Sequence, residues 1–253
     1  MKVVYQREEI TMNNVISFCI CFFFLTAFTY SATGENTPDT IATKKGNLIL
    51  HCIGHGSLML DYHGIKIYVD PVARFGNYSM MPKADIILIT HEHFDHLDTA
   101  TIHHLAKKET QIILTKSSFD ILKSGTVMAN GESKTIKDIL IEAVPAYNTS
   151  AGHEGYHPKG RDNGYVLTLS GKCIYIAGDT EDIPEMKALK DIDIVFLPMN
   201  QPWTMTPEQV AGAAKAFMPK ILYPYHYGDT DVSKLTALLK DTKNIEIRIK
   251  SMQ

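Results

Sequence analysis

The stretch that decides the fold is His91-Glu92-His93-Phe94-Asp95-His96, which directly follows a continuous apolar segment over residues 85–90. Its histidines and aspartate place four potential metal ligands within six residues, although the whole chain has only 11 histidines. Imidazole and carboxylate groups suit zinc, iron or manganese, and a loop leaving a rigid strand can direct alternate side chains to two neighbouring points. The stretch therefore predicts a metal site at the end of a buried strand, in preference to a polar loop that only caps the next helix.

The segments around this stretch predict a single domain of the α/β class. Short apolar or alternating runs predict strands at residues 47–53, 57–61, 65–70, 85–90, 111–115, 139–146, 164–169, 173–177, 192–197 and 245–249. Helices are predicted at residues 98–107, 183–189, 207–217 and 232–239. This order favours an αββα four-layer sandwich, and an ordinary doubly wound sheet also fits the pattern alone.

Composition and charge limit the class of function. The 253 residues are 45% hydrophobic and 21% charged, which is enough for one large domain with a substantial core. A formal net charge of −3 provides no broad basic field of the kind that nucleic acids attract. We therefore expect a small-molecule substrate and no nucleic-acid partner.

The N-terminal residues differ from the rest of the chain. Residues 15–28 form a nearly unbroken apolar run, followed by the small residues Ser31-Ala32-Thr33-Gly34. The run is shorter than the roughly 20 residues of a membrane span, so residues 1–34 are interpreted as a signal peptide, with an uncleaved N-terminal anchor as the alternative. Export to a periplasmic or secreted location is expected, with no stable span after cleavage. Residues 35–46 are polar and predict a flexible linker before a domain over 47–253.

The chain resembles the metallo-β-lactamase superfamily through several motifs in the same order. His-x-His-x-Asp-His after a strand is the signature of that family, and Gly178-Asp179-Thr180 and Pro224-Tyr225-His226-Tyr227-Gly228 match two later motifs. Gly54-His55-Gly56-Ser57 and Val69-Asp70-Pro71 resemble the opening of the branch that contains ascorbate-6-phosphate lactonase-like and N-acylphosphatidylethanolamine phospholipase D-like proteins. The resemblance covers roughly residue 47 to the C-terminus.

The resemblance implies two metal sites that share one ligand. His91 and His93 would hold the first metal together with a third histidine. The second metal would be held by Asp95, His96 and His226, and Asp179 would bridge the two.

The third histidine of the first site is absent from its usual place, because Tyr147-Asn148 follows the predicted strand at 139–146. His157 is the replacement candidate, and His153 is the alternative. Asn148 is expected as a weak or outer partner of the site. Asp70 is expected to support the ligand loop without binding a metal itself. His55 is expected to be mainly structural, although it could line the mouth of the site.

The resemblance further implies a hydrolase with two divalent ions. Zinc is expected, with manganese or iron as alternatives, and the ions would convert a bridging water into hydroxide that attacks an ester, lactone or phosphodiester. Asp179 would fix the metal separation, and Asp95 would also handle protons. Tyr225 is expected at the rim of the substrate site, and Trp203 either lines an apolar substrate pocket or packs beneath a loop.

Two other functional classes stay open from the sequence alone. A di-iron redox protein could use the same fold, although it would need an electron-delivery partner. A metal-binding protein without catalysis is the other alternative, and the Asn148 position is the feature that favours it.

Overall fold

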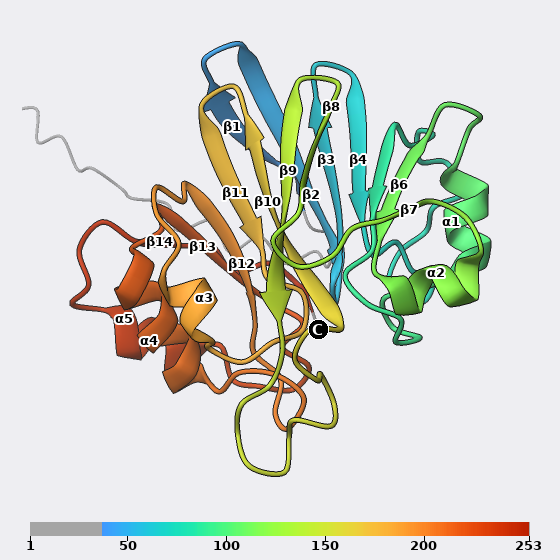
Figure 1. Ribbon diagram of the computed structural model, residues 1–253. Helices are drawn as coiled ribbons and strands as arrows, with labels where there is room; N and C mark the ends of the chain where they lie inside the picture. The colour runs from blue at the N-terminus through green and yellow to red at the C-terminus, as the bar shows by residue number, and fades with distance from the viewer. Residues whose placement is uncertain (1–36, 253) are drawn as a thin grey trace, which may run out of the picture. The chain divides into compact units, whose positions relative to one another are not determined.

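In the part of the chain that the structure describes, two β-sheets of seven strands each pack face to face, and helices cover their outer faces (Figure 1). The first sheet consists, in spatial order, of β1 (Asp39–Thr43), β2 (Gly46–Gly54), β3 (Ser57–Tyr62), β4 (Ile65–Val69), β5 (Ile86–Leu88), β6 (Gln111–Leu114) and β7 (Thr126–Val127). The second runs in reverse chain order and consists of β14 (Glu246–Ile247), β13 (Ile221–Tyr225), β12 (Ile194–Pro198), β11 (Lys172–Ile176), β10 (Asp162–Leu169), β9 (Ile139–Ala146) and β8 (Ser133–Ile136).

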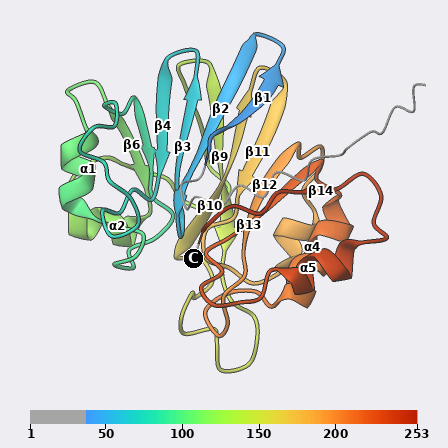
Figure 2. The same cartoon turned by 180° about the vertical axis from the view of Figure 1, so that it is seen from behind.

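The helices form the two outer layers (Figure 2). Beside the first sheet lie α1 (Thr99–Leu105) and α2 (Lys116–Leu122), and beside the second lie α3 (Pro184–Lys187), α4 (Pro207–Phe217) and α5 (Ser233–Leu239). This arrangement confirms the predicted αββα sandwich.

The computed structural model describes residues 37–252, which fall within the compact unit Gly34–Gln253. The predicted signal peptide or anchor at residues 1–34 lies outside the described residues. In the described part of the chain, no helix combines the length and the apolar character needed to cross a membrane.

A four-layer sandwich has three interfaces between its layers. In the described residues one large cluster fills the space between the two sheets and continues to Val210 of α4, on the second sheet's outer side. Burial alternates along β2, so that Leu48 and Leu50 point inward and join a cluster with Leu167 of the second sheet. A separate cluster lies on the outer face of the first sheet, where Ile87 packs with Ile102 of α1. Strands buried on both faces read as continuous apolar runs, which explains why β5 was recognisable in the sequence.

The prediction of a flexible linker at residues 35–46 is wrong for its described part, because β1 (Asp39–Thr43) pairs antiparallel with β2 at the edge of the first sheet. Of its five residues only Ile41 is buried, so the segment lacks the apolar alternation that identifies a strand in a sequence. Its order comes from distant contacts: the Asp39 carboxylate accepts hydrogen bonds from Lys250 Nζ and Tyr223 Oη, both at 2.6 Å.

We expect Asp39→Asn to lower the free energy of unfolding by about 1 kcal/mol at pH 7. Burial by itself would raise the pKa of Asp39, but the hydrogen bonds from Lys250 and Tyr223 hold it below its usual value. This contribution is therefore complete above the unfolded pKa of about 3.9, and it disappears as the pH falls through the lower folded pKa. Urea unfolding at pH 7 and pH 3 measures both effects. The exposed turn variant Asp138→Asn is the control, and an equal loss in both variants would contradict the prediction.

Both sheets change from antiparallel to parallel pairing along their width, at β4 in the first and at β11 in the second. The carboxyl ends of parallel strands lie at one edge of a sheet, which is where ligands bind in α/β proteins. The loops after β5, β11 and β13 leave from these ends and carry His91, Asp179 and His226. The long loop between β9 and β10, yellow-green at the bottom of Figure 1, lies at the same end of the sandwich.

Candidate metal centre

All seven predicted ligands converge at this end of the sandwich. Their ligand atoms form three groups, in each of which the atoms lie within 4.8 Å of one another: His91, His93 and His157; His91, His96 and Asp179; and His55, Asp95, His96 and His226. Because these groups share members, they describe one continuous cluster that could hold two neighbouring ions.

Asp179 lies between the two halves of the cluster. Its Oδ2 is 3.5 Å from His157 Nε2 on one side and 3.3 Å from His226 Nε2 on the other. Its Oδ1 is 3.5 Å from His96 Nε2. One carboxylate therefore faces both candidate metal positions.

The structure brings His157, and not His153, to the first group. His157 is 1% exposed, and its Nδ1 lies 2.9 Å from Asp162 Oδ2, which leaves Nε2 directed at the cluster. A carboxylate that binds one ring nitrogen of a histidine fixes the orientation of the other, as metal-binding histidines require. The side chain of His153 is 30% exposed and faces Glu181, with Nδ1 3.4 Å from Oε1.

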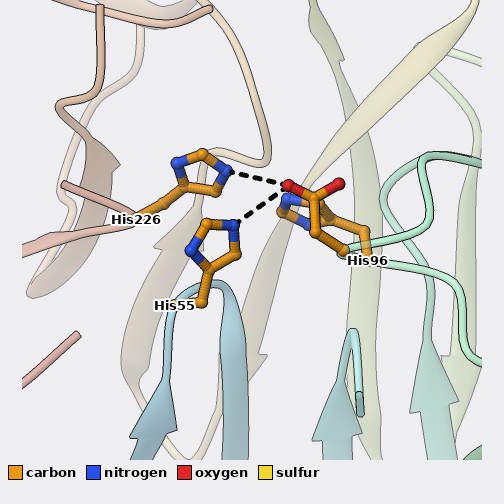
Figure 3. Close-up of side chains that lie close together, drawn as sticks. His55, His96 and His226 are labelled. Atoms are coloured by element: carbon orange, nitrogen blue, oxygen red, sulfur yellow. Dashed lines mark hydrogen bonds and ion pairs between the residues drawn. The ribbon is translucent and has the colours of Figure 1, made fainter. Parts of the chain in front are cut away.

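The second group contains a histidine that the sequence interpretation treated as mainly structural, with a possible place at the mouth of the site. Figure 3 shows the imidazoles of His55 and His226 turned toward one carboxylate, that of Asp95. His55 Nε2 is 3.1 Å from Asp95 Oδ2, and His226 Nε2 is 3.7 Å from the same oxygen. The His55 ring lies between Phe75, at 4.3 Å between ring centroids, and His226, at 3.7 Å.

The Gly54-His55-Gly56 turn is shaped to place His55 there. His55 has a φ of 51°, in the left-handed region, and its carbonyl accepts a hydrogen bond from His226 N at 3.1 Å. A Cβ on Gly56 would lie 2.7 Å from His96 Cε1, so that only glycine allows this turn to approach the cluster so closely. Both the strained backbone and the close approach are typical of functional sites.

The charges of the cluster suit divalent cations. Burial and the neighbouring His96 lower the pKa of His91 well below its usual value, which favours the neutral imidazole that binds metals. Burial would raise the pKa of Asp179, but His226 and His96 hold it below its usual value. Burial alone would lower the pKa of His96, but the carboxylates of Asp179 and Asp70 raise it to about 9, because negative charge is concentrated at this position.

Several buried polar atoms of the cluster have no hydrogen-bond partner among the described residues: His91 Nε2, His96 Nε2, His226 Nε2 and Asp179 Oδ1. Leaving a buried polar atom unpaired costs about 1–3 kcal/mol, so four in one place indicate that something else satisfies them. Imidazole nitrogens with two carboxylates form a donor set for divalent transition metals. The residues present therefore fit two such ions.

Asp70 keeps one ligand histidine and the start of the ligand loop in position, which is the role that the resemblance implied. It is 1% exposed, and its Oδ2 lies 2.8 Å from His96 Nδ1. The same carboxylate accepts hydrogen bonds from Thr90 N at 2.8 Å and Thr90 Oγ1 at 2.5 Å, which holds the beginning of the ligand loop.

Asn148 lies next to the first group through its backbone, because its N donates to the carbonyl of His157 at 2.8 Å. Its Nδ2 donates to the carbonyls of Trp203, at 2.8 Å, and His153, at 3.3 Å, and not to a ligand side chain. Asn148 instead ties the β9–β10 loop to the loop that carries Trp203. The buried Glu181 holds the start of the same loop, because its Oε2 accepts hydrogen bonds from Thr149 N at 2.8 Å and Ser150 N at 2.7 Å.

A cavity of about 670 Å³ opens onto the cluster, and it is lined by one of the two residues that were predicted to contact substrate. Trp203 lines this cavity and is 46% exposed, which agrees with a substrate pocket more than with packing beneath a loop. Tyr225 does not line it. That prediction is wrong, because Tyr225 is 1% exposed and its hydroxyl donates to Gly178 O at 3.3 Å, beneath the Asp179 turn.

The sequence interpretation gave no role at the site to Asp162, Arg161 and Glu181, and only a minor one to His55. Arg161 joins Asp162, with Nε 2.7 Å from Oδ1, to Glu92, with Nη1 3.1 Å from Oε1. For His55 the flanking glycines were an available signal. The others carry no local pattern that separates them from ordinary surface charges.

Comparisons with known proteins agree with this geometry. A family model described as a beta-lactamase superfamily domain matches residues 50–226. A UPF0173 metal-dependent hydrolase of Thermococcus kodakarensis is 30% identical over 192 residues, which cover 69% of this chain and 82% of that protein.

Two solved structures extend the likeness. A crystal structure of a proposed metal-dependent hydrolase from Parabacteroides distasonis is 55% identical with a TM-score of 0.84, and the match covers 87% of this chain and 100% of that chain. Igni18, a metallo hydrolase from Ignicoccus hospitalis, shares the fold at 21% identity with a TM-score of 0.67, over 81% of this chain and 96% of that chain.

Proposed function

Because the chain belongs to the metallo-β-lactamase superfamily, we propose that it is a metal-dependent hydrolase with two divalent ions, zinc in preference to manganese or iron, that cleaves an ester, lactone or phosphodiester of a small molecule. The family and the names of the relatives support metal-dependent hydrolysis. The count and identity of the ions and the bond that is cleaved are our inference from the site.

The observation that carries the proposal is the position of the Asp179 carboxylate. It faces His157 at 3.5 Å in one group and His226 at 3.3 Å in the other, while the cluster has enough further donors for both positions. A buried carboxylate with imidazoles on both sides is suited to bridging two cations, because a single cation would leave one side unsatisfied.

Bound divalent ions would supply a nucleophile by lowering the pKa of water and would polarise the bond that is cleaved. His91, His93 and His157 would hold one ion, and Asp95, His96 and His226 the other, with Asp179 shared. Asp95 lies beside the cavity and is 3.1 Å from His55, so it can take up or deliver a proton at Oδ2 during turnover. Asp162 and Asp70 keep His157 and His96 in position.

Metal analysis combined with a substrate panel tests the proposal. We expect about two divalent ions per chain and hydrolysis of at least one ester, lactone or phosphodiester, lost after chelation and restored by zinc. One ion per chain would contradict the dinuclear site. An iron-containing protein whose visible spectrum bleaches on reduction would favour the redox alternative, and a metal-loaded protein inactive on the whole panel would count against hydrolysis.

We expect His55→Phe to weaken metal binding at the Asp95 side of the cluster by about 10- to 100-fold. Phenylalanine keeps the ring between Phe75 and His226 but removes the nitrogen that lies 3.1 Å from Asp95 Oδ2. Competition with a chromogenic chelator measures the affinity. His63→Phe is the matched control, because His63 has the same φ of 51° but lies in an exposed turn. Equal affinities in both variants would contradict a role for His55.

A further inference from the structure

Four aromatic side chains from four different loops surround the cavity above the metal cluster: Phe75, Phe94, Tyr156 and Trp203. Three of them expose unusually large apolar surfaces, with Phe94 at 75%, Trp203 at 46% and Tyr156 at 38%. Phe94 stands between two predicted ligands, so its position is set by the metal loop and not by packing. Exposed apolar surface gathered around one cavity marks a binding site for an apolar group.

Hydrogen bonds hold the Trp203 side of this cavity in a fixed position. The Trp203 carbonyl accepts a hydrogen bond from Asn148 Nδ2 at 2.8 Å, and Thr204 N donates to Asn200 O at 2.9 Å across the same turn. The loop bearing Trp203 is therefore held to the β9–β10 loop that bears Tyr156 and His157. An aromatic wall in a fixed position loses little conformational entropy when a ligand binds.

One cation lines the same cavity. Arg74 is exposed, and its guanidinium lies 5.7 Å from the centroid of the Phe75 ring. The other arginines of the described chain each pair with carboxylates, Arg161 with Glu92 and Arg248 with Asp39, whereas no ion pair joins Arg74 to a described residue. Its charge is available to a ligand.

The spatial order of the cation, the aromatic rings and the metal cluster indicates the order in which a ligand would carry its anionic group, its apolar group and the bond that is cleaved. Arg74 lies over Phe75, the Phe75 ring stacks on His55 at 4.3 Å, and His55 contacts Asp95 of the metal cluster. An apolar surface thus separates the cation from the reacting centre. Guanidinium groups bind carboxylate, phosphate and sulfonate alike, through hydrogen bonds to their oxygens.

Building on the proposed function, we propose that the substrate is an amphiphilic anion, in which an aromatic or bulky apolar group connects the bond that is cleaved to an anionic group at Arg74. Phe75, Phe94, Tyr156 and Trp203 bind the apolar part. These residues determine specificity and take no part in bond cleavage.

Binding of a matched pair of probes to the metal-loaded full-length protein tests this proposal. The probes are 8-anilinonaphthalene-1-sulfonate and the neutral N-phenyl-1-naphthylamine, which differ in the sulfonate. Trp203 is the single tryptophan of the chain, so energy transfer from it reports binding at this cavity. We expect the sulfonate probe to bind about fivefold more tightly than the neutral probe.

Variants separate the two parts of the site. Arg74→Gln should make the two affinities equal, and Phe94→Ala should weaken both by roughly tenfold. Lys108→Gln and Ile121→Ala remove an exposed cation and an exposed apolar group outside the cavity, and both affinities should stay unchanged. An affinity ratio that Arg74→Gln does not change, or affinities that Phe94→Ala does not change, would overturn the proposal.

This experiment distinguishes failure of the inference from failure of the proposed function, since probe binding does not require turnover. Probe binding as expected, together with inactivity on the whole panel, would contradict hydrolysis and support the binding surface. For a hydrolysed ester with a remote carboxylate, Arg74→Gln should raise KM about fivefold at unchanged kcat. Active protein with an unchanged KM in this variant would overturn the inference alone.

Discussion

Replacing His157 with alanine is expected to reduce the metal content from about two ions per chain to about one, and to lower kcat/KM by about 10³-fold. The His157 side chain is buried, and its Nε2 points at Asp179 Oδ2 from 3.5 Å within the group that includes His91 and His93. Without it, two histidines and a shared carboxylate remain for the first ion. Elemental analysis and steady-state kinetics measure the two effects.

The fold should survive this substitution. The partner of His157 is the buried Asp162, which keeps its two hydrogen bonds from Arg161, at 2.7 and 2.9 Å. No carboxylate is therefore left unpaired, and the melting temperature of the metal-free protein should change little. His153→Ala, on the same loop, is the control and should keep both ions. Loss of metal in His153→Ala with full retention in His157→Ala would reverse our assignment of the first site.

Asp179→Asn is expected to have the larger effect, with at least about 10³-fold loss of kcat/KM and weaker binding of both ions. The amide has the size of the carboxylate but lacks its charge, and it cannot bridge two cations with both oxygens. Because Asp179 faces His96, His157 and His226, both groups lose a ligand at once. Isothermal titration with zinc should show two weakened sites, in contrast with one in His157→Ala.

Asp182→Asn provides the matched control for this substitution. Asp182 stands three residues further along the chain, with its side chain 20% exposed and paired with Lys187 at 2.6 Å. Removing a partly exposed ion pair costs less than about 1 kcal/mol, so metal content and activity should stay at the level of the unmodified protein. Asp179→Asn protein that still binds both ions with unchanged affinity would show that Asp179 does not bridge.

Much of the fold could be predicted because its signals are local. The bounds of β9 (Ile139–Ala146) and α4 (Pro207–Phe217) coincide with the predicted ones, and α4 begins at a capping box in which Thr206 and Gln209 bond reciprocally. Elements without a clear apolar pattern were missed. Helix α2 (Lys116–Leu122) buries only Ser118 and Leu122 and so shows no apolar stripe, and β1 is held by side chains near the far end of the sequence.

The residues of the site also divide into those with a local signal in the sequence and those without one. His91, His93, Asp95 and His96 were recognisable together because they follow a buried strand within one short loop. Tyr225 was assigned to the rim because of its place beside His226, but its side chain belongs to the larger hydrophobic core and its hydroxyl donates to Gly178 O. A one-residue step in a strand reverses the direction of a side chain, and sequence proximity to a ligand does not reveal it.

The sequence by itself determined the kind of chemistry, since the residue types in the motif and their spacing after a strand already select divalent metals. The tertiary structure alone decided which distant residues complete the site: His157 and not Asn148 or His153, and His55 beside Asp95. Metal binding depends on positions within a few ångströms, and the paths of the loops that set those positions depend on long-range contacts such as those of Asp162 and Glu181. Contacts of this kind leave no periodic pattern in the chain.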